Sequence, residues 1–188
     1  MRISDDRYTR DMRRYDLARR MIEYEARTTT IAEWTGLTKY RIQTLFREYT
    51  HLGEHTRHRG LSPFQPAFFS RSLLHECESA ALAAIELEME IIPEHLVPEA
   101  AKSLPGLARG ERLLNAFDLY TTLVPEPRIS LEHAVLLAKE LAGARTLGLR
   151  HCARCHGLMV IDRLGTLHED CAFCRLEGRG PTELDRAA

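Results

Sequence analysis

The sequence lacks any long uninterrupted apolar run. Its longest apolar stretch, from Ala80 to Ile92, is broken by Glu86, Glu88 and Glu90, so it does not provide the roughly 20 apolar residues that a transmembrane helix needs. The first seven residues, Met-Arg-Ile-Ser-Asp-Asp-Arg, contain no apolar core of a secretory signal. We therefore expect a cytoplasmic protein that does not enter a membrane, in a compartment that keeps thiols reduced.

The sequence also lacks the signatures of common zinc enzymes. It contains neither a His-Glu-x-x-His motif nor the His-x-Glu…Pro-Cys-x-x-Cys arrangement of zinc deaminases. No internal repeat, low-complexity tract or strand-rich region occurs before residue 150. These absences argue against an enzyme and favour a mostly α-helical protein.

Charge is unevenly distributed along the 188 residues, although the formal net charge is only −1. Residues 1–60 carry 13 Lys and Arg against 9 Asp and Glu, whereas residues 61–150 carry 8 against 12. A basic N-terminal region is compatible with nucleic-acid contact, but a solvated helical face explains the charge alone equally well.

Apolar residues that recur at steps of three and four indicate helices through most of the chain. Gly36 supplies a turn between two short helices, and Thr38 is the expected N-cap of the second. Residues 93–110 hold three prolines and two glycines, so we expect them to be mainly loop. The expected helices cover Thr9–Arg27, Thr30–Thr35, Lys39–Tyr49, Ala67–Ile91, Glu111–Leu123 and, capped by Ser130, the residues through Leu147.

These elements divide the chain into four parts. Residues 1–60 form an N-terminal helical region and residues 61–148 a helical core, with the boundary at Gly60-Leu61-Ser62-Pro63. Residues 149–176 form a cysteine module, and residues 177–188 are expected to be a disordered tail. Residues 51–59 are expected to be a basic linker, in which His55, Arg57 and Arg59 are candidate phosphate contacts.

Four cysteines near the C-terminus have the spacing of a metal site. Cys152 and Cys155 form one Cys-x2-Cys pair, and Cys171 and Cys174 form a second after fifteen intervening residues. Each pair aims two sulfurs at one ion from a tight turn, and a short hairpin with a strand at residues 158–161 brings the pairs together. We expect one structural Zn²⁺ per chain, because four thiolates leave no open position for catalysis.

Other ligands and metals are less favoured at this site. An iron–sulfur cluster also uses four cysteines, but it ranks below zinc. His151, His156 and His168 lie beside the ligands, and we expect them to be exposed or to support the ligands from outside. The fifth cysteine, Cys77, occupies a core-facing helical position and is expected to be a small buried apolar residue.

The segment from Thr28 to Arg47 has the spacing of a helix-turn-helix. Ala32 is small where two helices cross, Gly36 permits the turn, and Leu37, Ile42 and Leu45 pack the second helix onto the first. Trp34 and Phe46 are expected in the core. A purely structural helical hairpin remains the alternative. The outward residues, which suit base edges and phosphates, are Thr38, Lys39, Tyr40, Arg41, Gln43, Thr44 and Arg47.

The order of these motifs resembles the flagellar transcriptional regulator FlhC family over roughly residues 10–175. The resemblance rests on the N-terminal helix, Gly36-Leu37-Thr38-Lys39-Tyr40-Arg41-Ile42, and Gly60-Leu61-Ser62-Pro63-Phe64. It continues through the long helix to Ile92, Ala116-Phe117-Asp118-Leu119-Tyr120 and the final Cys-x2-Cys pairs. Two departures are His156-Gly157, where the family has Gly-Gly, and Lys139-Glu140-Leu141, where it has an Arg-Ala-Trp stretch.

The resemblance implies a DNA-binding transcriptional activator rather than an enzyme. Members of the family assemble with an FlhD-type partner, four partner chains with two chains of this kind. They bind promoter DNA upstream of flagellar operons and help to recruit RNA polymerase. The family's zinc ligands match Cys152, Cys155, Cys171 and Cys174. The alternative is a zinc-stabilised adaptor that binds protein partners without contacting DNA.

Overall fold

The computed structural model describes residues 5–50, 61–93, 104–165 and 167–178. These ranges contain seven α-helices, one short 3-10 helix and a two-stranded sheet. The expectation of a mostly α fold with a four-cysteine cluster near the C-terminus is confirmed. The elements are α1 (Asp5–Glu23), α2 (Thr28–Thr35), α3 (Lys39–Thr50), η1 (Pro66–Ser70), α4 (Leu73–Glu88), α5 (Leu107–Leu123), α6 (Leu131–Gly143), β1 (Leu147–His151), β2 (Leu158–Asp162) and α7 (Ala172–Glu177).

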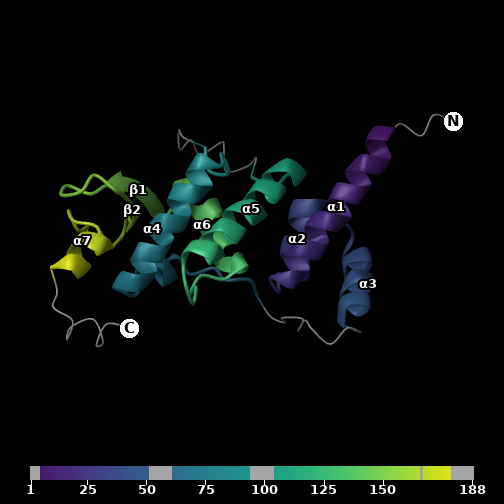
Figure 1. The fold of residues 1–188 in the computed structure, drawn as a ribbon, viewed down its shortest axis with the longest axis horizontal. Helices are drawn as coiled ribbons and strands as arrows, with labels where there is room; N and C mark the ends of the chain where they lie inside the picture. Colours follow the sequence, from purple (N-terminus) through teal and green to yellow (C-terminus); the bar gives the residue numbers. More distant parts are fainter. Residues whose placement is uncertain (1–4, 51–60, 94–103, 166, 179–188) are drawn as a thin grey trace.

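The molecule is elongated, with α1, α2 and α3 at one end and the sheet with α7 at the other (Figure 1). Helices α4, α5 and α6 lie between these ends. One cluster of buried apolar side chains extends from Leu17 in α1 to Leu147 in β1, so the N-terminal helices and the middle of the molecule share a core. None of the helices in the described ranges has both the length and the apolar content that a bilayer crossing requires.

The three N-terminal helices pack through a small set of large apolar side chains. Met21 of α1, Trp34 of α2, and Ile42 and Phe46 of α3 are all buried, as expected for Trp34 and Phe46. Gly36 ends α2 in the left-handed conformation, with φ of 70°, which turns the chain into α3. Apolar burial therefore sets the position of α3 against α1 and α2.

The helix expected over Ala67–Ile91 is two elements, so that expectation was wrong. Ser72 has extended backbone, and its hydroxyl accepts a hydrogen bond from the His75 N–H at 3.4 Å. This N-cap starts α4 afresh after the 3-10 helix η1. At the other end α4 stops at Glu88, and Glu90 has φ of 53°, so the chain leaves the helix before Pro93.

Two further boundaries differ from the expected ones. Helix α5 begins at Leu107, inside the segment expected to be mainly loop. Helix α6 ends at Gly143 rather than continuing through Leu147, because Ala144 takes the left-handed conformation with φ of 47°. Residues 147–151 are therefore free to form β1, which pairs antiparallel with β2 through Leu149↔Val160 and its neighbours.

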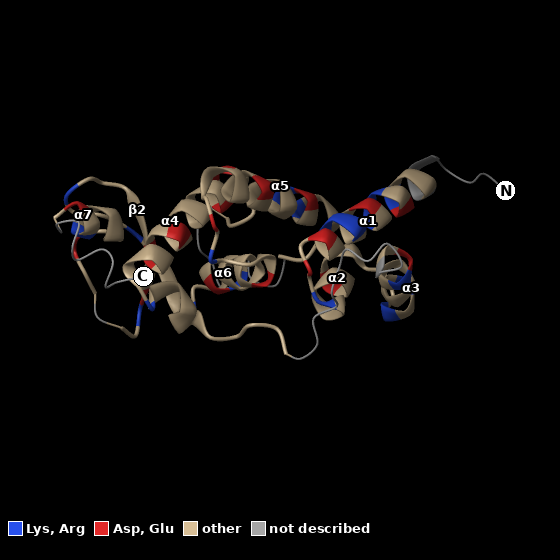
Figure 2. Cartoon of the chain, turned by 60° about the horizontal axis from the view of Figure 1, so that its bottom comes forward, with Lys and Arg blue, Asp and Glu red and all other residues tan. Residues whose placement is uncertain are grey.

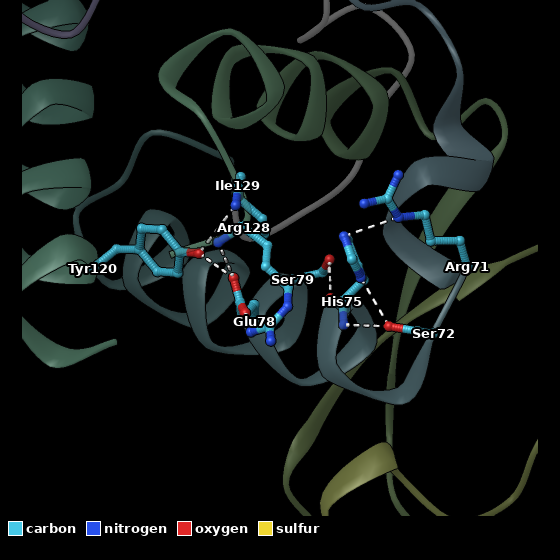
Figure 3. A network of polar contacts seen from close by, with 8 residues as sticks. All are labelled: Arg71, Ser72, His75, Glu78, Ser79, Tyr120, Arg128 and Ile129. Atoms are coloured by element: carbon cyan, nitrogen blue, oxygen red, sulfur yellow. Dashed lines mark hydrogen bonds and ion pairs between the residues drawn. The ribbon is translucent and has the colours of Figure 1, made fainter. Parts of the chain in front are cut away.

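Helix α4 carries a buried carboxylate whose hydrogen bonds tie the middle of the molecule together. Glu78 accepts hydrogen bonds from the Tyr120 hydroxyl at 2.5 Å and from the Arg128 N–H at 2.8 Å, and it pairs with the Arg128 guanidinium at 2.9 Å (Figure 3). Burial alone opposes ionisation, but these hydrogen bonds leave the Glu78 pKa below its ordinary value. The network connects α4, α5 and the segment that leads into α6.

Candidate metal centre

The four cysteines of the two Cys-x2-Cys pairs converge on one point. Their sulfur atoms all lie within 4.8 Å of one another. The Sγ atoms of Cys152 and Cys174 are 3.9 Å apart, and those of Cys155 and Cys171 are 3.6 Å apart. A tetrahedral Zn²⁺ with Zn–S bonds of about 2.3 Å places its sulfurs about 3.8 Å apart. The residues present therefore fit one metal ion such as zinc.

Each pair is held by a different local structure. Cys152 directly follows β1, and the turn to Cys155 is closed by hydrogen bonds from Cys152 N–H to the Gly157 carbonyl (2.9 Å) and from His156 N–H to the Cys152 carbonyl (3.0 Å). Cys171 is the N-cap of α7 and its sulfur accepts the Cys174 N–H at 3.5 Å. The strand pairing of β1 and β2 and the short helix α7 thus bring the two pairs together.

Backbone N–H groups point at the sulfurs. Cys152 Sγ accepts hydrogen bonds from the N–H of Cys171 at 3.2 Å and of Arg154 at 3.4 Å. Backbone hydrogen bonds, with that of Cys155 the largest, lower the pKa of Cys152 to about 6 against the opposing effect of burial. Gly157 N–H donates to Cys155 Sγ at 3.4 Å. These donors stabilise thiolate at Cys152, and thiolate is the form that binds metal. In contrast, burial raises the pKa of Cys171, and the hydrogen bond with Cys155 followed by burial raises the pKa of Cys174.

The cluster offers four thiols as metal ligands. All five cysteines are free rather than disulfide-bonded. Three of the four clustered cysteines are buried and Cys155 is exposed. Within the described residues, no histidine or carboxylate belongs to the cluster. His151, His156 and His168 are exposed, and His151 Nδ1 lies 3.0 Å from the His156 carbonyl.

The cysteine module, which contains β1, β2, α7 and the segments between them, packs on α4 through β2 and α7. Leu73 and Cys77 of α4 form a buried cluster with Ala172 of α7, and Leu176 packs against it. Arg175 of α7 also forms an ion pair with Glu76 of α4. Cys77 is buried as expected, and burial raises its pKa to about 12. Glu76 was not singled out in the sequence because nothing in its spacing marks it as a docking residue.

The residues expected to contact DNA lie on or next to α3, away from the cysteine module (Figures 1 and 2). Thr38, Lys39, Arg41, Gln43 and Arg47 are exposed, and Thr44 is half-buried. Tyr40, with 73% of its surface exposed, is the most exposed large apolar residue of α3.

Some of these side chains are engaged within α3 itself. The Thr38 hydroxyl accepts a hydrogen bond from the Arg41 N–H at 3.4 Å, in agreement with its expected role as N-cap. Thr44 donates to the Tyr40 carbonyl at 3.1 Å and accepts from Arg47 Nη2 at 3.2 Å. The other expected phosphate contacts, His55, Arg57 and Arg59, lie outside the described residues, as does the tail beyond residue 178.

No protein-family model matches the chain, and no curated protein matches it significantly.

Proposed function

We propose that this protein is a DNA-binding subunit of a transcriptional activator, related to the FlhC family, and that α3 reads DNA as the second helix of a helix-turn-helix. The observation that carries the proposal is the division of α3 into two faces. Ile42 and Phe46 are buried against α1 and α2, whereas Lys39, Tyr40, Arg41 and Gln43 are exposed at the end of the molecule. Cationic and amide side chains of this kind bind phosphates and base edges.

The charge of the exposed face supports this role. Within α3, Lys39, Arg41 and Arg47 outnumber the single acidic residue Glu48. An exposed cationic helix has favourable electrostatics with the DNA backbone, and the affinity it contributes falls as salt rises. By family resemblance, the protein acts with an FlhD-type partner at promoters upstream of flagellar operons and helps to recruit RNA polymerase.

A salt titration of DNA affinity tests the proposal. The full chain, co-purified with its FlhD-type partner, is titrated against promoter fragments by fluorescence anisotropy. We expect the double variant Arg41→Ala/Arg47→Ala to bind more weakly, with a salt slope smaller by about 2, because two phosphate contacts are lost. The matched control is Arg145→Ala/Arg150→Ala, which removes two exposed positive charges outside α3 and should leave the slope unchanged. Unchanged affinity in the α3 variant would rule out this assignment of α3.

We further propose that the ion in the cysteine module is Zn²⁺, one per chain, with a structural role. Four thiolates complete a tetrahedral site, and Cys152, Cys155, Cys171 and Cys174 would hold the ion without a free position. Elemental analysis of the purified chain should give a zinc-to-chain ratio of about 1. Spectroscopy of the cobalt-substituted protein should show four thiolate ligands; a bound water would instead favour an open, catalytic site.

A second candidate function is a zinc-stabilised adaptor that binds proteins without contacting DNA. It is favoured by exposed apolar side chains on the cysteine module, since Leu164, Leu167 and Phe173 are 86%, 54% and 50% exposed. Exposed apolar groups of this kind are common at protein interfaces. The adaptor would retain its partner yet show no salt-dependent affinity for DNA, so the same titration distinguishes the two functions.

A further inference from the structure

The four clustered thiols of the cysteine module differ in their access to solvent. Cys152, Cys171 and Cys174 are buried, with 1%, 3% and 6% of their surface exposed. Cys155 is exposed, as is every other residue of the turn from Ala153 to Gly157. A small solute in water therefore meets Cys155 before it reaches the other three.

The hydrogen bonds at the sulfurs add to this difference. Cys152 Sγ accepts two backbone N–H groups, at 3.2 Å and 3.4 Å. Cys155 Sγ accepts one backbone N–H, from Gly157 at 3.4 Å. N–H donors that stabilise a thiolate also lower its nucleophilicity. The exposed sulfur is therefore less shielded from an electrophile than the buried sulfur of the same Cys-x2-Cys pair.

A second thiol lies directly beside Cys155. The Sγ atoms of Cys155 and Cys171 are 3.6 Å apart, closer than the 3.9 Å between those of Cys152 and Cys174. A disulfide bond is about 2.05 Å long, so the two sulfurs must approach by about 1.6 Å to form one. Cys155 lies in an exposed turn, so this movement needs no rearrangement of the buried core.

We propose that Cys155 is a peroxide-reactive thiol, and that its oxidation to a disulfide with Cys171 releases the metal. An accessible thiolate beside a second thiol is the arrangement of redox-sensing cysteines. The inference rests on the zinc site proposed above and adds a form of regulation to it. The oxidant is hydrogen peroxide or an organic hydroperoxide.

Oxidation proceeds in two displacements. The Cys155 thiolate attacks one oxygen of hydrogen peroxide, so an S–O bond forms, the O–O bond breaks and hydroxide leaves. The Cys171 thiolate then attacks the sulfur of this sulfenic acid, so the S–S bond forms, the S–O bond breaks and a second hydroxide leaves. The two thiolates lose two electrons in total, and the peroxide gains them. Cys152 and Cys174 remain as ligands, and two thiolates do not complete a tetrahedral site.

Trapping of the sulfenic acid in the unaltered, zinc-loaded chain tests which thiol reacts first. The protein is treated with hydrogen peroxide and dimedone, which adds to sulfenic acids, and its peptides are identified by mass spectrometry. We expect the adduct on Cys155, whereas the buried Cys77 should stay reduced as an internal control. Without dimedone, we expect a disulfide between Cys155 and Cys171 and release of zinc to a chromogenic chelator. A first adduct on Cys152 or Cys174, or full retention of zinc, would overturn the proposal.

Cys155→His separates oxidation from metal binding. Three thiolates and one imidazole also complete a tetrahedral zinc site, so this variant should hold about one zinc per chain. Imidazole does not form a sulfenic acid, so peroxide should release zinc at least about ten-fold more slowly than from the parent protein. Cys77→Ser, which removes a thiol outside the ligand set, should release zinc at the parent rate. Parent-like release by Cys155→His would overturn the redox proposal alone. A parent chain that holds no zinc before oxidation would instead refute the metal site, and this inference with it.

Discussion

The two ends of the molecule are stabilised by different means. At the α1–α3 end, large apolar side chains such as Met21, Trp34 and Phe46 are buried. In the cysteine module, the buried cluster consists of Cys152, Cys171, Cys174 and one other residue, Met159. So few apolar atoms cannot offset the entropy of ordering the segments that carry the four thiols, whereas a bound metal can. The other apolar side chains of the module pack outward, Leu147 and Val160 against the shared core and Ala172 against α4. Structure at one end should thus depend on burial and at the other on metal.

Metal removal should have the largest effect and should be confined to the cysteine module. Metal binding in modules of this kind contributes on the order of 10 kcal/mol, more than the module gains from its apolar contacts. We expect chelation, or Cys152→Ser, to abolish the protection of amide hydrogens in β1, β2 and α7, while those of α1–α3 stay protected. Hydrogen exchange with and without a chelator measures this.

The control for the metal prediction is the fifth cysteine. Cys77→Ser makes the same chemical change outside the cluster of ligands, so it should leave the metal content and the protection of β1 and β2 intact. If the amide hydrogens of β1, β2 and α7 stay protected from exchange after complete metal loss, the proposed difference between the two ends is wrong.

At the other end, truncation of an apolar side chain should have the next largest effect. Trp34 is 1% exposed, and Trp34→Ala should lower the free energy of unfolding by about 3–5 kcal/mol through lost burial and a cavity. Urea denaturation followed by circular dichroism measures this. Tyr40→Ala, a truncation of a 73% exposed side chain in α3, should change stability by no more than about 0.5 kcal/mol. Comparable losses in the two variants would contradict the packing described for this end.

The sequence predicted both ends well because their signals are local. Cysteine spacing alone identified all four clustered residues, and the alternation of buried Ile42 and Phe46 with exposed Lys39 and Arg41 follows helical periodicity. The middle of the chain was harder to predict. The break at Ser72 depends on a hydroxyl that caps α4, and the early end of α6 at Gly143 depends on the left-handed conformation of Ala144.

Helix α4 shows why the helical spacing of apolar residues was not enough to predict burial in the middle of the chain. A single apolar stripe predicts one buried face, but α4 packs against α5, α6, β2 and α7 and is buried on more than one side. As a result Ser79 and Glu86 are fully buried, while Ala84, an apolar residue one turn after the buried Ala80, is exposed. Acidic side chains are mostly exposed in folded proteins, and at Glu86 tertiary packing overrides that local preference.

Helix α4 carries two buried carboxylates, and they should respond oppositely to mutation and pH. Glu86 is fully buried and neither oxygen has a hydrogen-bond partner among the described residues, so burial raises its pKa well above 4.5. The unfolded chain loses this proton first, so stability should fall as pH rises above about 4.5. Glu86→Met should raise the free energy of unfolding by about 1–3 kcal/mol at pH 7, and the gain should shrink as pH falls toward 4.5.

Glu78→Met is the matched control on the same helix. The pKa of Glu78 is lowered by its hydrogen bonds, so its contribution is present above pH 4.5 and is lost as pH falls through its folded-state pKa. This variant should therefore destabilise the protein at pH 7. Urea denaturation of both variants from pH 4 to pH 8 distinguishes them. Because α4 contacts both β2 and α5, an unchanged metal-to-chain ratio in Glu86→Met would show that this helix can be stabilised without altering the cysteine module.

The smallest expected change in stability comes from replacing one glycine at each end of the molecule by alanine. Gly36 has φ of 70°, and an added Cβ would meet only Arg14 side-chain atoms at 3.7 Å or more, so Gly36→Ala is opposed by the backbone conformation rather than by crowding. The left-handed conformation costs a residue with a Cβ about 1–2 kcal/mol. Gly178, at the end of α7, has φ of −77° and no contact closer than 3.8 Å, so Gly178→Ala should cost nothing.

Thermal unfolding of the metal-loaded protein measures both glycine variants. Gly36→Ala should lower the midpoint by a few degrees, and Gly36→Asn should recover part of this loss because asparagine tolerates the left-handed region better than alanine. In Gly36→Ala, amide hydrogens of α2 and α3 should exchange faster than in the parent protein. Those of the cysteine module should exchange at an unchanged rate, because metal binding stabilises that module independently of this turn. Loosening of β1 and β2 in the same variant would mean that the two ends unfold as one unit, with the shared middle helices transmitting the change.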